Sequence, residues 1–403
     1  MTLLWVSVLL SFFSIVWAYE QPPQSVPNDP FYDVPPNLDQ YKPGDIIRRR
    51  EISQKFWVDA NISKIVEVAY KTNLALGGDT WSIATIITPG NPDPNLKLYS
   101  YQFFEDAVQL SCAPSWSLKN GLFSPGISSV VNSLTGTVGS QLRAGRHVVV
   151  PDHEGYISAF FSGRQEGKAG LDGIRAALNE LNASVSDTPV ALYGYSGGGH
   201  ATAWMVNLQP DYAPELNIVG AAYGGVLIDA LKELQWTDQK GAEAKGSVAA
   251  LLTGLLLGNP PANESLWSHF SPYLKTKIYQ LRTIPNFCSS ELLWLDSDDT
   301  IQSNIDVDIA TFPPAVQMFK KETLLSNYSS IPIPTPKFPR YIYQGVDDTL
   351  APYYLVKQYV DQQLATGANI EFVPYPGLDH IPVAFKGLDA AMDWIDQVFD
   401  KTD

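Results

Sequence analysis

The stretch that decides the fold is "PVALYGYSGGGHATAW", residues 189–204. An apolar, strand-forming run ends at Ser196, and three glycines follow before a run of small, helix-forming residues. Gly194, Ser196 and Gly198 fit the pattern G-x-S-x-G, in which a serine occupies a sharp turn between a strand and a helix. Side chains two positions before and after the serine would collide with neighbouring backbone. The pattern therefore predicts a turn that presents the Ser196 hydroxyl and the free amide of Gly197. The alternative, a glycine-rich phosphate-binding turn, lacks both G-x-G-x-x-G and a P-loop lysine.

A serine hydroxyl is a weak nucleophile and needs a base, normally an imidazole, and the chain has five histidines. In folds with this turn the acid and the histidine follow the serine along the chain, which excludes His147 and His153. His200 lies one turn into the helix that the serine begins, and His269 lies in a helical region away from any sheet edge. His380 follows the strand-like run "IEFVPYPGLD" and precedes the last helix. We therefore predict His380 as the base.

The acid that orients the base should follow the preceding strand, in "RYIYQGVDDTLAP". This segment offers Asp347 and Asp348, and the pattern of residues favours neither. One of them can hold the imidazole and stabilise its cation, and the other can cap the following helix. Asp379 is too close to His380 in sequence to orient the ring in the usual way.

Acyl transfer also needs a second N–H group that stabilises the oxyanion, in addition to the amide of Gly197. Such a donor usually lies in the loop after an early strand. The HGGG motif of many lipases is absent, and the loop after "YSYQFF" contains Glu105, Asp106 and Ala107. We therefore expect the second donor to be a backbone amide of this loop.

Strand-like and helical patterns alternate over residues 62–228 and resume over residues 328–403. Because the strands are apolar without alternation, they indicate a mostly parallel sheet covered on both faces. Residues 229–327 are helical in composition, which predicts an inserted helical domain of roughly a hundred residues. Within it, "VAALLTGLLL" (248–257) is too short to span a bilayer. It fits either a buried helix of that domain or a helix that faces lipid.

The N-terminus resembles a targeting segment. Residues 1–18 are largely apolar and end in Ala18, which predicts a secretory signal peptide rather than the alternative, a membrane anchor. Residues 19–61 are rich in proline and predict an extended surface arm.

Two cysteines, Cys112 and Cys288, suit one disulfide in an oxidising compartment, although two buried thiols are the alternative. Four sequons make candidates for glycosylation of Asn61, Asn182, Asn263 and Asn327.

Composition narrows the classes of partner. The chain has 403 residues, 45% of them hydrophobic, so it can bury a large core. A formal net charge of −15 argues against nucleic acids and anionic membranes as partners. No spacing typical of a zinc or calcium site is present, and we expect neither a metal nor an organic cofactor. The sequence does not indicate the oligomeric state, and we expect a monomer.

Several motifs together resemble one family. "FEDAVQLSCAPSWSL", "VVVPDHEG", "GRQEGKAGLDGIRA", "GYSGGG" and "YQGVDDTLAPY…GANIEFVPYPGLDH" look like the secreted fungal lipases of the lipase A type, including the Candida extracellular lipases. The similarity covers most of the chain after residue 18 and is weakest in the proline-rich arm and the helical insertion.

The resemblance implies an α/β-hydrolase core with a mostly parallel sheet and an inserted helical cap domain. It implies Ser196, Asp348 and His380 as nucleophile, acid and base, because "TLAPY" aligns the second of the two aspartates with the family's acid. It places the oxyanion amides at Asp106 and Gly197, and it pairs Cys112 with Cys288.

The implied activity is that of a secreted, extracellular triacylglycerol lipase acting on lipid esters at a lipid–water interface. Two alternatives remain. One is a soluble carboxylesterase, or a peptidase on the same fold. The other is a non-catalytic binding protein that has kept the hydrolase fold.

Overall fold

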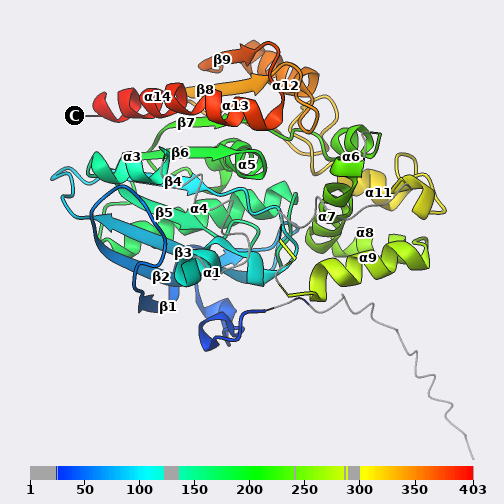
Figure 1. The fold of residues 1–403 in the computed structure, drawn as a ribbon, viewed down its shortest axis with the longest axis horizontal. Helices are drawn as coiled ribbons and strands as arrows, with labels where there is room; N and C mark the ends of the chain where they lie inside the picture. Colours follow the sequence, from blue (N-terminus) through cyan, green and yellow to red (C-terminus); the bar gives the residue numbers. More distant parts are fainter. Residues whose placement is uncertain are drawn as a thin grey trace, which may run out of the picture.

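The computed structural model describes residues 24, 26–121, 136–239, 242–285, 287–288 and 300–402. Their centre is a nine-stranded sheet with the strand order β1-β2-β3-β5-β4-β6-β7-β8-β9 (Figure 1). The strands are β1 (Ile46–Glu51), β2 (Ile62–Asn73), β3 (Asp79–Pro89), β4 (Leu98–Gln102), β5 (His147–Pro151), β6 (Val190–Tyr195), β7 (Ile218–Gly224), β8 (Arg340–Gly345) and β9 (Ile370–Tyr375). The predicted signal peptide, residues 1–18, lies outside the described residues.

The parallel part of the sheet consists of β5, β4, β6, β7, β8 and β9, in this spatial order. Strands β1, β2 and β3 extend it at one edge as antiparallel strands. Every residue of β4, β5, β6 and β8 is buried, as expected for strands covered on both faces. Strand β9, at the edge opposite β1, is not buried: its residues are partly or fully exposed. The mostly parallel, helix-covered sheet predicted from the sequence is thus confirmed.

One strand lies where the sequence predicts a proline-rich arm. β1 pairs with β2 in antiparallel fashion, although its sequence, IIRRRE, carries four charged residues. The charges are tolerated because β1 is an edge strand and each of two arginines has a carboxylate partner. Arg49 binds Glu180 at 2.8 Å, and Arg50 binds the buried Glu67 at 2.5 Å.

The α-helices are α1 (Pro114–Asn120), α3 (Val138–Arg143), α4 (Gly163–Glu180), α5 (Gly197–Tyr212), α6 (Ala230–Asp238), α7 (Ala242–Gly258), α8 (Pro260–Trp267), α9 (Pro272–Thr283), α11 (Pro313–Phe319), α12 (Tyr353–Ala365), α13 (His380–Lys386) and α14 (Leu388–Asp400). Short 3-10 helices are η1 (Pro30–Tyr32), η2 (Leu38–Gln40), η3 (Leu110–Cys112) and η5 (Gln302–Asn304).

Two hydrophobic clusters place helices on the two faces of the sheet. On one face, α4, α5 and α12 bury side chains such as Leu171, Met205 and Val356. On the other face, α3, α13 and α14 contribute residues such as Leu142 and Ile395. Both faces of the central strands are therefore shielded from water, and only the strand ends remain for building a site.

A third hydrophobic cluster belongs to α6, α7, α8, α9 and α11, which follow β7 and precede β8. Figure 1 shows these helices gathered beside the sheet, at the ends toward which β4 and β6 point. The chain segments that enter and leave them pair with each other: Ala230 N–H donates to Glu322 O, and Leu324 N–H donates to Ile228 O. The Thr323 hydroxyl also donates to Asp229 at 2.6 Å. These two paired segments thus connect the helical insertion to the sheet.

Helix α7 is the centre of the insertion. All residues from Val248 to Leu257 are buried in the structure, on every side of the helix, which is the pattern of a core helix. The sequence left two interpretations of this segment, a buried helix or a helix that faces lipid. In this structure the helix is buried. Among the described residues, no helix combines the length and hydropathy needed to cross a membrane.

Candidate active site

Ser196 occupies the turn between β6 and α5 and has a positive φ of 58°, with ψ −124°. Non-glycine residues rarely adopt such a conformation, and it is common where strain serves a function. The neighbouring glycines make the turn possible. A Cβ added to Gly194 would lie 2.0 Å from Gly198 O, and one added to Gly198 would lie 2.0 Å from Gln102 O. The predicted glycine-lined turn is therefore present, and it leaves Ser196 partly exposed.

Three side chains from separate loops form a continuous relay. The Ser196 hydroxyl lies 2.8 Å from His380 Nε2, and His380 Nδ1 lies 2.8 Å from Asp348 Oδ2. Asp348 follows β8 and His380 follows β9, so both reach the same edge of the parallel sheet as Ser196. A carboxylate can only accept the Nδ1 proton, which leaves Nε2 free to accept the serine proton. The relay can thus generate a serine alkoxide.

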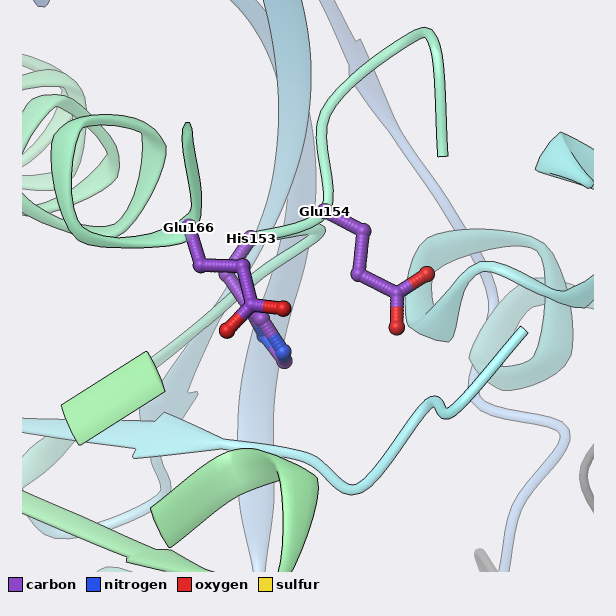
Figure 2. A group of neighbouring side chains, drawn as sticks. All are labelled: His153, Glu154 and Glu166. Carbon is purple, nitrogen blue, oxygen red and sulfur yellow. The ribbon is translucent and has the colours of Figure 1, made fainter. Parts of the chain in front are cut away.

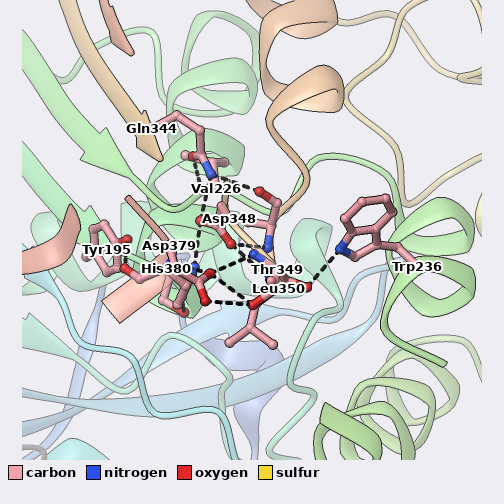
Figure 3. Close-up of polar contacts among 11 residues, drawn as sticks. Tyr195, Val226, Trp236, Gln344, Asp348, Thr349, Leu350, Asp379 and His380 are labelled. Atoms are coloured by element: carbon pink, nitrogen blue, oxygen red, sulfur yellow. Dashed lines mark hydrogen bonds and ion pairs between the residues drawn. The ribbon is translucent and has the colours of Figure 1, made fainter. Parts of the chain in front are cut away.

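The structure distinguishes the two neighbouring aspartates. Asp347 is exposed, whereas Asp348 is buried and accepts four hydrogen bonds. Its Oδ1 accepts from the amides of Leu350 and Ala351, and its Oδ2 accepts from Gln344 Nε2 as well as from the histidine (Figure 3). These donors fix the orientation of the carboxylate toward His380.

The imidazole of His380 is buried, which disfavours its cation. The charge and hydrogen bond of Asp348 act in the opposite direction, with smaller contributions from the charges of Asp106 and Asp379. The net effect raises the pKa of His380. A stronger base is better able to take the proton of a serine hydroxyl during attack on an ester.

The predicted oxyanion residues lie side by side. A Cβ added to Gly197 would come within 1.9 Å of Asp106 Oδ1. Asp106 has a positive φ of 49°, and among the described residues its amide donates no hydrogen bond, although the amides of Glu105 and Ala107 do. The amide of Gly197 is the first of α5, where helical amides have no partner within the helix. Burial raises the pKa of the Asp106 carboxyl to about 7.

Two of the remaining histidines, His200 and His269, have other partners. His200 lies in the helix after Ser196 but faces away from it: its Nδ1 lies 2.7 Å from Glu166, and its Nε2 accepts from Trp204 at 3.0 Å. His269 pairs with Asp306 within the helical insertion. These contacts agree with the choice of base made from chain order and position.

His153, Glu154 and Glu166 have the composition of a metal site, and their ligand atoms lie within 4.8 Å of one another (Figure 2). All three side chains are buried. Glu166 accepts from Phe161 N–H at 2.7 Å as well as from His200, and Glu154 accepts from Ala107 N–H at 3.4 Å. These bonds join the turn after β5 to the loop that contains Ala107, and they join α4 to α5.

The structure contains the disulfide between Cys112 and Cys288, with Cα atoms 5.5 Å apart. It joins η3, which follows the loop containing Asp106, to the segment after α9. Of the four sequon asparagines, Asn61, Asn182 and Asn327 are exposed. Asn263 is buried within α8, with 3% of its surface exposed, so its amide is not accessible to a glycan in this conformation.

Two supporting side chains are absent from the sequence prediction. Gln344 bridges the end of β7 to the acid, since its Oε1 accepts from Val226 N–H while its Nε2 donates to Asp348. The Tyr195 hydroxyl donates to the carbonyl of His380. Gln344 lies four residues before Asp348, and Tyr195 occupies the unspecified position before Ser196 in G-x-S-x-G, so no motif requires either side chain. Only the folded arrangement shows their roles.

Comparisons with known proteins agree with this geometry. The sequence profile described as "Secretory lipase" matches residues 128–403. Lipase A of Moesziomyces aphidis is 35% identical over 376 residues, covering 93% of this chain and 80% of that protein. The secreted triacylglycerol lipase LIP2 of Malassezia furfur is 32% identical over 362 residues, covering 87% and 74% of the two chains.

The crystal structure of Candida antarctica lipase A in its closed state superimposes with a TM-score of 0.88 at 35% identity. The match covers 93% of this chain and 86% of that one. A match over this share of the chain includes most of the sheet and most of the helical insertion. On its sequence and its fold alike, this chain belongs to the secretory lipase family.

Proposed function

We propose that the protein is a secreted triacylglycerol lipase that cleaves fatty-acid esters through a serine acyl-enzyme. The observation that carries the proposal is the unbroken relay of 2.8 Å contacts from Ser196 through His380 to Asp348. A relative of 32% identity bears the name of a secreted triacylglycerol lipase, and the same activity in this chain accounts for the arrangement of the site.

In the proposed mechanism, Ser196 Oγ attacks the ester carbonyl while His380 Nε2 takes its proton. Asp348 stabilises the imidazolium, and the amides of Asp106 and Gly197 donate to the oxyanion of the tetrahedral intermediate. When the intermediate collapses, His380 returns the proton to the departing alcohol oxygen. Water, activated by the same imidazole, then attacks the acyl-enzyme and releases the fatty acid and the free serine.

The surroundings of the serine support an apolar acyl group. The ring of Phe160 lies 3.4 Å from where a Cβ of Gly197 would be, and Phe160 belongs to the hydrophobic cluster of the insertion. The same cluster contains Leu251 and Leu255 of α7. The hydrophobic cluster of the insertion therefore extends to Gly197, the residue that follows the nucleophile. We propose residues 229–327 as a cap domain that shelters the acyl chain, with 62–228 and 328–403 as the hydrolase core.

Apolar side chains beside the base support action at a lipid–water interface. Ile381 and Phe385 lie one turn apart on α13, directly after His380, and are 61% and 62% exposed. Exposed apolar groups around an active site are a common feature of surfaces that contact lipid. We infer that the protein is exported by cleavage after Ala18 and acts outside the cell as a monomer.

The test compares the wild type with Ser196→Ala on emulsions of short-chain and long-chain triglycerides and on a soluble ester. Removing the nucleophile of such a relay should lower the rate by about a thousandfold or more. The control is Ser186→Ala, because Ser186 is an exposed turn residue before β6, whereas Ser196 follows the opposite end of that strand. A Ser196→Ala protein that keeps most of its activity would contradict the mechanism.

The same assays separate the alternatives. A rate that rises sharply once the substrate forms droplets supports the lipase, whereas saturation on monomeric ester without response to droplets supports a soluble esterase. A wild-type protein that fails to react with an organophosphonate would support a non-catalytic binding protein.

A further inference from the structure

One carboxylate connects the two loops that carry the acid and the base. Asp379 Oδ1 accepts from Thr349 N–H at 2.8 Å, from the Thr349 hydroxyl at 2.9 Å and from His380 N–H at 2.7 Å (Figure 3). Thr349 directly follows Asp348, and Asp379 directly precedes His380. Through these contacts Asp379 links Thr349, the residue after Asp348, to the main chain of His380. We call this set of hydrogen bonds the Asp379 clasp.

The residues on either side of the clasp are fixed by further contacts. The carbonyl of His380 accepts from the Tyr195 hydroxyl, so the main chain of the histidine is held at its N–H by Asp379 and at its carbonyl by Tyr195. The carbonyl of Thr349 accepts from Trp236 Nε1 of α6 at 2.8 Å. The clasp thus joins two loops. The loop of His380 is also held by Tyr195, and the loop of Thr349 is also held by Trp236.

The relay needs such a connection because its atoms come from different loops. Asp348 and His380 follow neighbouring strands, and only the Nδ1–Oδ2 contact joins their side chains directly. The imidazole must keep this contact while its Nε2 exchanges a proton with Ser196. A displacement of about 1 Å in such a geometry costs about a hundredfold in rate.

We propose that Asp379 is a positioning residue, whose clasp on Thr349 and His380 keeps the acid loop and the base loop aligned for proton transfer. The proposal rests on the proposed hydrolase function of the site. It gives Asp379 a role different from that of an orienting acid, because its carboxylate acts on the main chain of His380 and not on the ring.

The charge of Asp379 adds a measurable signature. Burial opposes its ionisation, but hydrogen bonds from the Thr349 amide, the His380 amide and the Thr349 hydroxyl outweigh it and lower the pKa of Asp379. The carboxylates that face His380 are Asp348, Asp106 and Asp379, and all three raise the pKa of the imidazole. Removing the charge at position 379 should lower that pKa and shift the acidic limb of the rate profile to lower pH.

The experiment measures kcat and KM between pH 5 and 9 on a water-soluble short-chain nitrophenyl ester. Asp379→Ala removes both the clasp and the charge, and we expect kcat to fall about 10- to 100-fold with KM changed by less than about twofold. Asp379→Asn keeps an acceptor oxygen for the two amides. It should recover most of kcat while the acidic limb stays shifted to lower pH.

Two further variants are matched controls. Asp361→Asn removes an exposed carboxylate of α12 that pairs with Lys357, and it should leave both kcat and the pH profile unchanged. Thr349→Val removes the hydroxyl donor but keeps the amide, so its loss of kcat should be smaller than that of Asp379→Ala.

The outcomes separate this inference from the function on which it rests. A wild-type protein that hydrolyses no ester and reacts with no organophosphonate would overturn the proposed function. If the wild type is active, and Asp379→Ala has the wild-type kcat and acidic limb, the positioning role is overturned. A variant that only melts at a lower temperature, with unchanged kcat per folded molecule, would also overturn it.

Discussion

Asp347 and Asp348 are adjacent and chemically identical, and both follow β8, yet their surroundings differ. Asp347 is exposed, and no hydrogen bond is formed by its carboxylate within the part of the chain that the structure describes. Asp348 is buried and accepts from Gln344, His380 and two backbone amides. A buried carboxylate held by several donors can orient an imidazole, whereas an exposed and unrestrained one cannot.

We therefore predict different results for two matched substitutions. Asp348→Asn should lower kcat/KM by about 10³- to 10⁴-fold, because an amide at this position can favour the wrong tautomer of His380. Asp347→Asn should change kcat/KM by less than about twofold. Steady-state kinetics on a soluble ester check both, and equal losses in the two variants would contradict the assignment.

The sequence predicts some of the residues of the relay and not others, for physical reasons. Ser196 is recognisable because a strained turn needs glycines at fixed positions, and His380 because chain order and strand position exclude the other histidines. The choice between the two aspartates depends on burial, which the residue pattern does not show. Only the resemblance to the fungal lipases indicated Asp348. Gln344 and Tyr195 act through contacts between distant segments, so no local pattern marks them.

At the scale of secondary-structure elements, α7 shows how the insertion is attached to the core. A Cβ on Gly254 would lie 1.9 Å from Phe160 O and 2.6 Å from Phe160 N, which are backbone atoms that cannot rotate away. The helix therefore approaches the loop before α4 as closely as a backbone allows. Phe160 also contacts the neighbourhood of Gly197, so the position of α7 affects the apolar surface beside the serine.

Gly254→Ala should force α7 away from this loop and lower the stability by about 1–3 kcal/mol. In an unobstructed helix the same change raises stability by about 1 kcal/mol, so the sign of the effect is diagnostic. Chemical denaturation followed by circular dichroism measures it. An unchanged or higher free energy of unfolding would show that the close approach does not restrict the helix.

Elements are predictable from the sequence where the pattern reflects burial on both faces. β5 and β6 are fully buried runs within residues 62–228, where the sequence predicts alternating strands and helices. β1 is not predictable in this way because its charged residues reflect an edge position and partners such as Glu67 and Glu180 that lie far along the chain. The division of the helices between the two faces of the sheet likewise depends on packing that no single helix encodes.

The whole molecule combines a net charge of −15 with carboxyl groups buried near the site. Burial raises the pKa of Asp106 to about 7 and that of Asp152 to about 8, although hydrogen bonds from Ser115 partly oppose the shift at Asp152. Burial, together with neighbouring carboxylates, also raises the pKa of Glu154. The folded protein thus retains protons that the unfolded chain releases above about pH 4.

Stability should therefore fall as the pH rises from 6.5 to 8. In this window the unfolded chain binds fewer protons than the folded one, which gives a negative slope of the free energy of unfolding against pH. The raised pKa of His380 acts in the same direction, and the lowered pKa values of His147 and His153 act mainly below this window. Growing negative charge adds self-repulsion.

Calorimetric melting temperatures at pH 6.5 and 8, at fixed ionic strength, check this prediction. The melting temperature should be higher at pH 6.5, and Asp152→Asn should reduce the difference because it removes one of the retained protons. A higher melting temperature at pH 8 would show that the buried carboxyl groups are already ionised in the folded protein.

The central claim, that the fold activates the single hydroxyl of Ser196 through His380, is tested most directly by mapping a covalent adduct. The protein is treated with an alkyl organophosphonate, digested and analysed by mass spectrometry. One phosphonyl group per chain on the peptide containing Ser196, lost in His380→Ala, is the predicted result. An adduct on a different residue, or ester hydrolysis that continues with Ser196 unmodified, would contradict the claim.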